Sequence, residues 1–501
     1  MVAMPIFTCR FTEETTPLRH VWEHTVGSGH AELALRADWQ EQLRRCHREL
    51  GFRYVRFHAL LSHPMDTLIC QNNEWLYSFF NADQIFDFIL SIGMKPFVEL
   101  SFMPEALASG SKTAFHYRAN VTPPKDFKQW AALMRKLCRH WIERYGAEEV
   151  RSWFFEVWNE PNLDAFGSGQ QKGYFKLYRT TVEAIKSVDS SLRVGGPVTA
   201  KSEWISDFVA FLKKHKLPAD FISTHQYPTD AFGSPGDDTA TQLSKSKRGV
   251  MQEKAQDARR EAAGRPLHYT EWCTSSNPRD HLHDEPFAAA FATNIVLSVD
   301  SVVDGYSWWT FSDIFNENYM PSVPFQGGFG LLTIHNIAKP VYRAFELLHQ
   351  LGTKRLMVDG LHNTVSAWVV RGGKRSATVM LTNHALPKHP IKTEKVQVHL
   401  THAPKPLKAH VERVDETHAN ATRIWRQMKK PEYLTREQVK QLQKASELVK
   451  EAQSWKEEAG GIVMEVDLPP HSIAAITIAF APEWTGRHTR ARRKAKPRRR
   501  S

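Results

Sequence analysis

Short apolar runs alternate with longer amphipathic ones from about residue 20 to residue 350. Apolar runs of roughly four to eight residues are typical of buried strands, whereas apolar positions that recur every three or four residues predict helices. The predicted strands cover residues 20–26, 52–58, 95–101, 152–159, 193–198, 221–227, 267–272 and 305–312. The clearest predicted helices cover residues 38–50, 126–145, 174–188, 287–299 and 340–351.

This alternation predicts an α/β protein in which eight strands are each followed by a helix, and that order is typical of a closed (β/α)8 TIM barrel. An open doubly wound sheet is the alternative. It usually carries a glycine-rich phosphate-binding turn after its first strand, and the sequence has no such turn. We therefore expect a catalytic barrel over residues 18–351.

The pattern changes after residue 351, where short alternating segments with polar turns predict an accessory C-terminal β-sandwich. We expect this sandwich over residues 352–484, with a helical insertion near residues 434–453 that has amphipathic spacing. Residues 1–17 contain the run "PIFTCRF", which we expect to add one or more strands to the sandwich.

The net charge of +12 changes this picture only at one end of the chain. Residues 487–501 hold nine Lys and Arg residues and no acid, so removing these nine charges from +12 leaves +3 for the other 486 residues. We expect residues 485–501 to form a basic disordered tail, because the segment has almost no apolar residues. It has no aromatic residues between its charges, so the sequence predicts weak polyanion contact at most and no nucleic-acid site.

The five cysteines show no CxxC spacing, and this excludes the common zinc and thioredoxin-like motifs. The start "MVAMPIFTCRFTEE" lacks the basic and apolar regions of a signal peptide, and the sequence has no run of 18 apolar residues. Scattered thiols are typical of a reducing compartment. We therefore expect a cytoplasmic protein that does not enter a membrane.

Polar residues gather where the predicted strands end, which is where barrel enzymes carry their working side chains. These residues are His58, Ser101, Asn159–Glu160, His225–Tyr227, Thr270–Glu271 and Ser312–Asp313. Glu160 in "VWNEP" and Glu271 in "HYTEW" close strands four and seven, which we expect to meet across the barrel mouth. A buried carboxylate is costly unless it is paired or used, so a structural ion pair is the alternative for Glu160.

Two carboxylates across a pocket are the groups that glycosidic bond cleavage requires. One donates a proton to the leaving oxygen, and the other attacks the anomeric carbon or activates a water molecule. A separation of about 5–5.5 Å gives retention of configuration and one of about 6.5–9.5 Å gives inversion. The sequence leaves this distance open. It also supplies Asn159 for a sugar hydroxyl, and Trp158, Trp272, Trp308 and Trp309 as apolar faces for a sugar ring.

Strand periodicity limits which of these side chains can share the pocket. Asn159 and Glu160 point to opposite faces of a regular strand, so both enter the pocket only if the strand end twists or bulges. For the same reason only one of Trp308 and Trp309 points inward, and we choose Trp309. Glu99 and Glu156 are interpreted as structural.

Five motifs occur in the order "GFRYVRFH", "FFEVWNEPN", "FISTHQYPTDAFG", "HYTEW" and "WWTFSDIF". With these motifs the chain resembles the family-39 glycoside hydrolases, and specifically the bacterial β-xylosidases among them. The resemblance extends over nearly everything except the basic tail. The two acid motifs occur in many barrel glycosidases. Their combination with "STHQYPTDAFG" is far more specific.

The resemblance implies a retaining mechanism with Glu160 as general acid/base and Glu271 as nucleophile. It also implies that further side chains bind the sugar, namely His58, Asn159, His225, Tyr227, Trp309 and Glu317. The family usually shows two consecutive acids after the "SDIF" run, whereas Asn316 precedes Glu317 here.

We therefore expect an exo-acting hydrolase that releases β-D-xylose from the non-reducing end of xylo-oligosaccharides, without a metal or organic cofactor. The alternatives are a related family-39 enzyme acting on another pyranoside or on arabinose, such as an α-L-iduronidase-like enzyme or an arabinosidase, and an inactive carbohydrate-binding barrel. Family likeness also implies an assembly of identical subunits.

Overall fold

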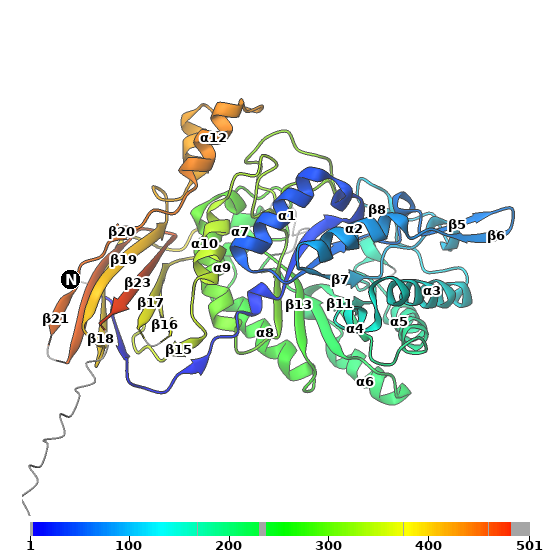
Figure 1. The fold of residues 1–501 in the computed structure, drawn as a ribbon, viewed down its shortest axis with the longest axis horizontal. Coiled ribbons are helices and arrows are strands. Elements are labelled where there is room, and N and C mark those ends of the chain that lie inside the picture. The colour runs from blue at the N-terminus through cyan, green and yellow to red at the C-terminus, as the bar shows by residue number, and fades with distance from the viewer. Residues whose placement is uncertain (1–3, 168, 230–236, 374, 459, 482–501) are drawn as a thin grey trace, which may run out of the picture.

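A computed structural model describes residues 4–167, 169–229, 237–373, 375–458 and 460–481 of the chain. Eight parallel strands close into a barrel in the order β10-β11-β12-β13-β14-β3-β4-β7 (Figure 1). They are β3 (Thr25–His30), β4 (Tyr54–His58), β7 (Lys95–Glu99), β10 (Phe154–Glu156), β11 (Arg193–Thr199), β12 (Phe221–His225), β13 (Leu267–Trp272) and β14 (Gly305–Trp308).

Each barrel strand is followed by a helix that packs outside the barrel. In chain order these helices are α1 (Ala37–Leu50), α2 (Phe80–Ser91), α3 (Phe127–Tyr145), α5 (Gln171–Lys186), α6 (Ile205–His215), α8 (Val250–Glu261), α9 (Pro286–Val299) and α10 (Pro340–His349). Shorter elements lie in the loops, namely α4 (Ala147–Arg151), α7 (Thr239–Ser244) and the hairpins β5 (Leu68–Gln71) with β6 (Glu74–Tyr77) and β8 (Thr113–Ala114) with β9 (Ala119–Asn120). The predicted (β/α)8 barrel is confirmed.

The first barrel strand differs from the prediction, which placed it over residues 20–26. The structure has a short 3-10 helix at Val21–Glu23, and β3 begins only at Thr25. Val21 is buried against the core, which explains the apolar signal of this segment. Gly27 in β3 gives no strand signal, yet the barrel needs it because a Cβ atom there would collide with the Trp309 ring.

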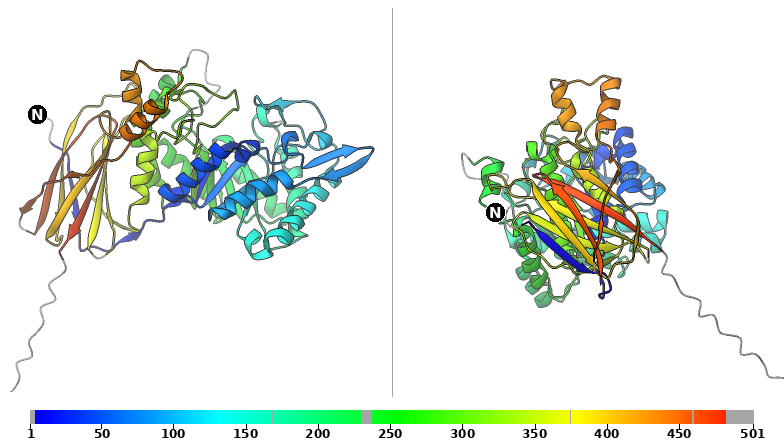
Figure 2. Two further views of the ribbon diagram at one scale, coloured as in Figure 1. Left: turned by 45° about the horizontal axis from the view of Figure 1, so that its top comes forward. Right: turned by 90° about the vertical axis from the view of Figure 1, so that its left-hand side faces the viewer.

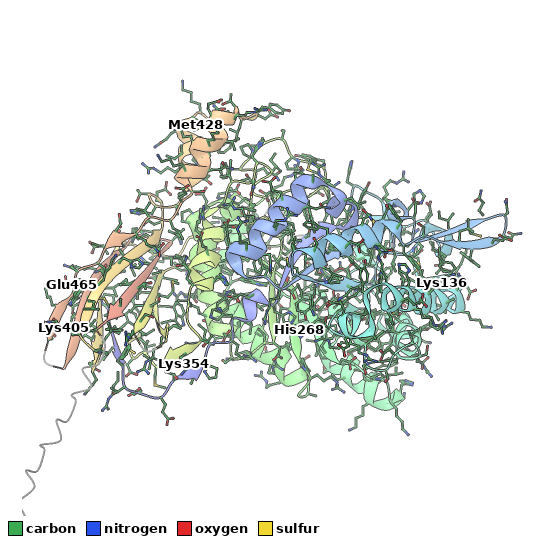
Figure 3. All side chains as sticks on the ribbon, viewed as in Figure 1. Lys136, His268, Lys354, Lys405, Met428 and Glu465 are labelled. Carbon is green, nitrogen blue, oxygen red and sulfur yellow. The ribbon has the colours of Figure 1, made fainter. Side chains whose placement is uncertain are left out.

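Aromatic rings close the barrel at the N-terminal ends of its strands. Phe97 and Phe154 stack with their centroids 5.0 Å apart, and Phe221 meets both edge to face. His268 completes the plug with its ring centroid 5.2 Å from that of Phe154, and Figure 3 labels this residue on the barrel. Only the opposite end of the barrel is therefore left for a site.

Because it is buried, His268 should make the fold sensitive to acid. Burial lowers the pKa of His268 to about 4, whereas an unfolded histidine titrates near about 6.5. Above about pH 6.5 His268 is neutral in both the folded and the unfolded chain, so its contribution to the free energy of unfolding is at its maximum there. As the pH falls from about 6.5 toward 4 the unfolded chain binds a proton that the folded chain does not, and stability falls by up to about 1.4 kcal/mol per pH unit for this residue.

We expect His268→Phe to reduce the difference in Tm between pH 7.5 and pH 5. The exposed His63 offers a matched control, since His63→Phe should leave that difference unchanged. Scanning calorimetry of the three proteins makes the comparison. A wild-type difference in Tm retained by His268→Phe would contradict the assignment.

Two further sheets pack against each other beside the barrel (Figure 2). One has the order β1-β18-β22-β21 and the other β2-β15-β16-β17-β23-β19-β20. Their strands are β1 (Ile6–Arg10), β2 (Thr16–Pro17), β15 (Lys354–Leu356), β16 (Val365–Arg371), β17 (Ser376–Asn383), β18 (Glu394–Thr401), β19 (Pro406–Val414), β20 (Glu451–Ala452), β21 (Lys456–Glu458), β22 (Gly461–Leu468) and β23 (Ser472–Phe480). The predicted accessory sandwich agrees with these sheets.

The N-terminal segment lies in this sandwich, where β1 pairs in parallel with β18 and β2 pairs with β15. Helix α9 lies between sandwich and barrel with almost all its residues buried, which is typical of a helix that is apolar all round. The insertion contains two helices, α11 (Ala421–Gln427) and α12 (Arg436–Ala445). Helix α12 is shorter than the segment predicted over 434–453.

The predicted basic tail, residues 485–501, lies outside the described residues. Among the helices that the structure does describe, none has the length and apolar character needed to cross a membrane.

Candidate active site

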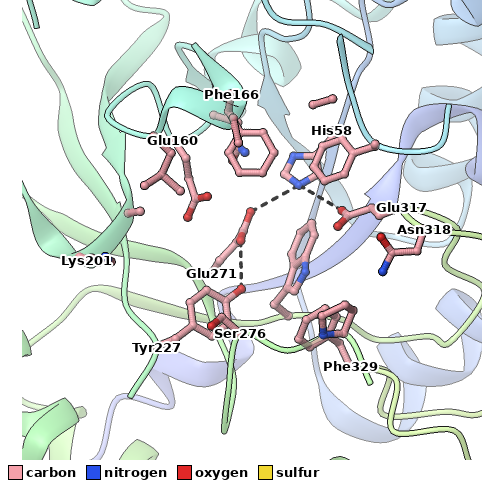
Figure 4. A pocket seen from close by; sticks show the side chains of 18 of the residues that line it. His58, Glu160, Phe166, Lys201, Tyr227, Glu271, Ser276, Glu317, Asn318 and Phe329 are labelled. Carbon is pink, nitrogen blue, oxygen red and sulfur yellow. Dashed lines mark hydrogen bonds and ion pairs between the residues drawn. The ribbon is translucent and has the colours of Figure 1, made fainter. Parts of the chain in front are cut away.

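A cavity of about 530 Å³ opens at the C-terminal ends of the barrel strands (Figure 4). Seven of the eight predicted site residues line it: His58, Asn159, Glu160, Tyr227, Glu271, Trp309 and Glu317. In Figure 4 the Glu160 and Glu271 carboxylates point into the same space, and His58 and Glu317 lie on its other side. The barrel thus brings together side chains that are up to 259 positions apart, from His58 to Glu317.

His225 is the predicted residue that does not line the cavity. Its side chain is fully buried, with Nδ1 2.9 Å from Glu160 Oε1 and 3.5 Å from Glu271 Oε2. His225 therefore lies between the two glutamates and supports them. This buried position indicates a supporting role for His225, whereas the sequence predicted a direct contact with the sugar.

The irregular end of β10 explains how Asn159 and Glu160 both reach the cavity. The strand stops at Glu156, and Trp158 and Glu160 then adopt left-handed backbone conformations with φ of 78° and 43°. The Glu160 N–H donates to Val198 O at 2.9 Å and anchors this turn on the neighbouring strand. Left-handed residues that are not glycine are costly and cluster at functional sites. A left-handed turn at the end of β10 therefore provides the departure from regular strand geometry that lets both Asn159 and Glu160 enter the cavity.

The two glutamates are close enough for one sugar carbon to lie between them. A carboxylate oxygen of each lies within 4.8 Å of the other. Glu271 is held at both oxygens, because Arg56 Nη1 donates to Oε1 at 2.7 Å and the Tyr227 hydroxyl donates to Oε2 at 3.0 Å. Glu160, Glu271 and His225 are also residue types that bind metal ions. Each of the three side chains already has a hydrogen-bond partner in the protein.

Arg56 connects four polar groups beneath the cavity. Its guanidinium donates to Glu156 at 2.6 Å, to Glu271 at 2.7 Å and to Asn159 at 3.0 Å, and it forms an ion pair with Glu99 at 2.7 Å. Arg56 is not among the predicted site residues. The available signal was its position two residues before His58, on the same face of the strand. Glu99 and Glu156 have the structural role that the sequence indicated, since both are fully buried partners of Arg56.

We expect Arg56→Leu to destabilise the fold by about 3–5 kcal/mol, because the substitution leaves buried carboxylates without a cation. Arg36→Leu is the matched control. Arg36 forms an exposed pair with Asp38, and such pairs contribute about 0–1 kcal/mol. Denaturant unfolding of both variants measures the difference. Equal destabilisation by the two substitutions would contradict the role of Arg56.

Glu160 has the titration behaviour of an acid catalyst. Burial raises the pKa of Glu160 to about 7, and the Glu99 charge adds to the rise while His58 and Arg56 oppose it. Burial is the largest of these causes.

A relay of hydrogen bonds also favours the protonated form of Glu160. Thr270 donates its single hydroxyl hydrogen to Glu156 at 2.8 Å, so it accepts from Nε2 of His225 at 3.1 Å. Burial lowers the pKa of His225 to about 3, so this ring is neutral. With its hydrogen on Nε2, the ring presents the lone pair of Nδ1 to Glu160 and accepts a hydrogen bond from the protonated carboxyl group at 2.9 Å.

His58 and Glu317 form the opposite wall. Burial opposes the cationic form of His58, but Glu99 at 2.8 Å and Glu271 raise its pKa to about 9. Burial together with Glu271 and Glu160 raises the pKa of Glu317 to about 8. Glu317 Oε1 lies 3.6 Å from His58 Nε2 and has no hydrogen-bond partner among the described residues. This wall therefore offers one cationic donor and one carboxyl group to a sugar.

Of the four tryptophans proposed as sugar platforms, Trp309 is the one that lines the cavity. Trp158, Trp272 and Trp308 are core residues with at most 3% of their surface exposed. Asn316, which stands where the family usually has an acid, is hydrogen-bonded to His30 at 2.8 Å through its Oδ1 atom.

An eight-stranded parallel barrel with two glutamates facing each other across a cavity defines a glycosidase that hydrolyses O-glycosyl bonds. The sequence profile of Glycosyl hydrolases family 39 matches residues 9–462, and the chain belongs to this family.

Known relatives cover most of the chain. It is 47% identical to a β-xylosidase of Caldicellulosiruptor saccharolyticus over 477 residues, which are 94% of this chain and 98% of the relative. A β-xylosidase of Geobacillus stearothermophilus is 37% identical over 444 residues, 85% of this chain and 86% of the relative. The crystal structure of a monomeric β-xylosidase from Caulobacter crescentus CB15 superposes with a TM-score of 0.84 at 32% identity, over 95% of this chain and 100% of that chain.

Proposed function

We propose that the protein is a retaining exo-β-xylosidase that releases β-D-xylose from the non-reducing end of xylo-oligosaccharides. Glu160 is the acid/base and Glu271 the nucleophile. The observation that carries the proposal is the pair of carboxylate oxygens within 4.8 Å of each other inside one cavity. Such a close approach supports the separation of about 5–5.5 Å between carboxyl groups that is typical of retaining enzymes.

In the first half-reaction a Glu271 oxygen attacks the anomeric carbon while Glu160 donates its proton to the leaving oxygen. Arg56 and Tyr227 fix both oxygens of Glu271, so the attack needs little reorganisation. Asn159 lies next to Glu160 with its Oδ1 held by Arg56. Its NH2 group is then available to a sugar hydroxyl.

In the second half-reaction Glu160 takes a proton from the attacking water. The bond to Glu271 has by then removed one negative charge from the site, and fewer neighbouring anions lower the pKa of Glu160. The same side chain therefore acts first as an acid and then as a base. Hydrolysis of the ester bond between xylose and Glu271 releases the sugar, and Glu271 is again ionised while Glu160 is again protonated.

The pH profile should show the acid role directly. The active form carries a proton on Glu160, whose pKa is about 7, so kcat/KM should fall as the pH rises above about 7. We expect this limb for xylobiose, whose leaving group needs a proton. It should be much weaker for dinitrophenyl β-xyloside, whose leaving group does not. Identical alkaline limbs for both substrates would contradict the assignment.

A panel of nitrophenyl glycosides tests the function. We expect hydrolysis of the β-D-xyloside at a kcat/KM at least about tenfold above that of the α-L-iduronide and α-L-arabinoside, because specificity follows differential transition-state binding. A higher kcat/KM for the iduronide or the arabinoside would instead favour an α-L-iduronidase-like enzyme or an arabinosidase. Hydrolysis of none would favour a carbohydrate-binding barrel.

Other expectations accompany this proposal. Cytoplasmic location is supported by five free cysteines in the described chain, of which only Cys70 is exposed. Assembly of identical subunits and weak polyanion binding by residues 487–501 stay predictions. Light scattering tests the first, and a salt titration of RNA binding with and without these residues tests the second.

A further inference from the structure

Two chemically different sets of side chains line the active-site cavity. The set that we call the polar end contains His58, Asn159, Tyr227, Glu271 and Glu317. The set that we call the apolar end contains mainly apolar side chains, which are Ala114, Phe115, Leu163, Ala165, Phe166 and Ala200. Phe115 adjoins both sets, because its ring stacks on that of His58 with their centroids 5.8 Å apart. One sugar satisfies the hydrogen-bonding groups of the first end. The second end calls for a different kind of ligand.

The apolar end lies on the side of the leaving group. Leu163 donates its N–H to Glu160 O at 3.0 Å, and Phe166 donates its N–H to Leu163 O at 3.2 Å, so these residues belong to the same turn as Glu160. Glu160 must reach the oxygen of the leaving group to protonate it. Whatever is attached to that oxygen therefore extends along this turn, and Figure 4 shows Phe166 above the space between Glu160 and His58.

Two phenyl rings form a fixed surface there. Phe115 and Phe166 stack with their centroids 5.1 Å apart and their planes 28° apart. Trp158 Nε1 donates to Phe166 O at 2.7 Å and holds the turn. Phe115 has a left-handed backbone with φ of 64°, a conformation that persists at ligand-binding positions because the surroundings impose it. The surface is therefore organised before a ligand binds.

Among the described residues, the polar side chains next in sequence to this end are Lys112, Thr113 and Lys201, so a second sugar would find fewer hydrogen-bond partners here than at the polar end. Among the described lining residues there, Lys112 already forms an ion pair with Asp164 at 2.9 Å, and Lys201 also has interactions of its own. Hydroxyl groups placed against apolar side chains without partners lose hydrogen bonds to water, whereas an aromatic ring gains from offset stacking on phenyl rings.

We propose that the Phe115–Phe166 surface is a subsite for an uncharged aromatic aglycone, so that the enzyme prefers arylalkyl β-xylosides to unsubstituted xylo-oligosaccharides. This inference rests on the proposed function, because it assigns the leaving group of the same reaction. Phe166 contributes to ligand binding on the leaving-group side, and the glutamates carry out the chemistry.

Benzyl and methyl β-D-xyloside test the proposal, because their leaving alcohols are of nearly equal acidity and differ in the ring. We expect kcat/KM for the benzyl compound to be at least about tenfold higher in the wild type, a typical gain for an added apolar group in a matching pocket. Benzyl β-xyloside should also exceed xylobiose. Phe166→Ala should bring the ratio of benzyl to methyl close to one.

Phe80→Ala is the matched control, since Phe80 is an exposed ring at the start of α2 and the ratio should keep its wild-type value. Phe166→Leu keeps an apolar side chain but has no stacking face, so its ratio of benzyl to methyl kcat/KM should be intermediate. This variant replaces Phe166→Ala in the test if Phe166→Ala does not fold. Benzyl alcohol added as an acceptor should also divert more xylosyl-enzyme to transfer product than cyclohexylmethanol does.

Equal kcat/KM for benzyl and methyl β-xyloside in the wild type, or a ratio unchanged by Phe166→Leu and Phe166→Ala, would overturn the aglycone subsite. Equal transfer to the two alcohols would overturn its preference for aromatic rings. Failure of the proposed function is distinguishable, since nitrophenyl β-xyloside would then be hydrolysed no better than the iduronide or the arabinoside, or not at all.

Discussion

Glu271→Ala should lower kcat for nitrophenyl β-xyloside by about 10⁴-fold or more, because losing a covalent nucleophile removes the pathway that the rest of the site supports. The truncated side chain leaves a space beside Arg56 and Tyr227, which both donate to Glu271 in the wild type. Azide fits such a space and is an anion. We therefore expect azide to restore turnover and to yield α-xylosyl azide, the product of inverted configuration.

The exposed Glu437 on α12 provides the control, since Glu437→Ala should retain wild-type kinetics. Product configuration can be followed by proton NMR. A β-configured azide product from Glu271→Ala, or residual activity within tenfold of the wild type, would assign the nucleophile to another residue.

Glu160→Ala should separate substrates by the acidity of their leaving groups. General acid catalysis contributes about 10²–10⁴-fold, so cleavage of xylobiose should fall by about that factor. The glycosylation step with dinitrophenyl β-xyloside should be nearly unchanged, and the xylosyl-enzyme should then accumulate because no base activates water. A pre-steady-state burst of dinitrophenol measures this step directly.

Glu160→Gln keeps the size of the side chain and its contact with His225 but cannot donate a carboxylic proton, so it should behave like Glu160→Ala. Added azide should speed the second step in both variants and give β-xylosyl azide. Equal losses for xylobiose and dinitrophenyl β-xyloside would remove Glu160 from the acid role.

Much of the site was predictable because barrel topology places the ends of parallel strands on one rim. Glu160 and Glu271 were found in this way, as polar residues that end apolar strands. Strand alternation allowed only one of Trp308 and Trp309 to point inward, and the structure has Trp309 in the cavity and Trp308 in the core. These predictions depend only on periodicity and topology.

Other features depend on contacts between distant segments, which one sequence does not reveal. Arg56 has the pattern of a strand residue, and its four polar partners come from three other strands and the turn after one of them. The contact of Glu160 with His225 depends on the left-handed turn at Trp158 and Glu160, which brings Glu160 to the end of β12. Residues 20–26 were mistaken for a strand because Val21 and Trp22 are buried by the rest of the barrel.

The central claim is that Glu271 forms a covalent bond to the sugar. Incubation with dinitrophenyl 2-deoxy-2-fluoro-β-xyloside, followed by peptide mass spectrometry, tests it most directly, because the fluorine slows release of the intermediate. We predict inactivation with one fluoroxylosyl group on the peptide containing Glu271. A label on another carboxylate, or inactivation with no bound sugar, would contradict the account.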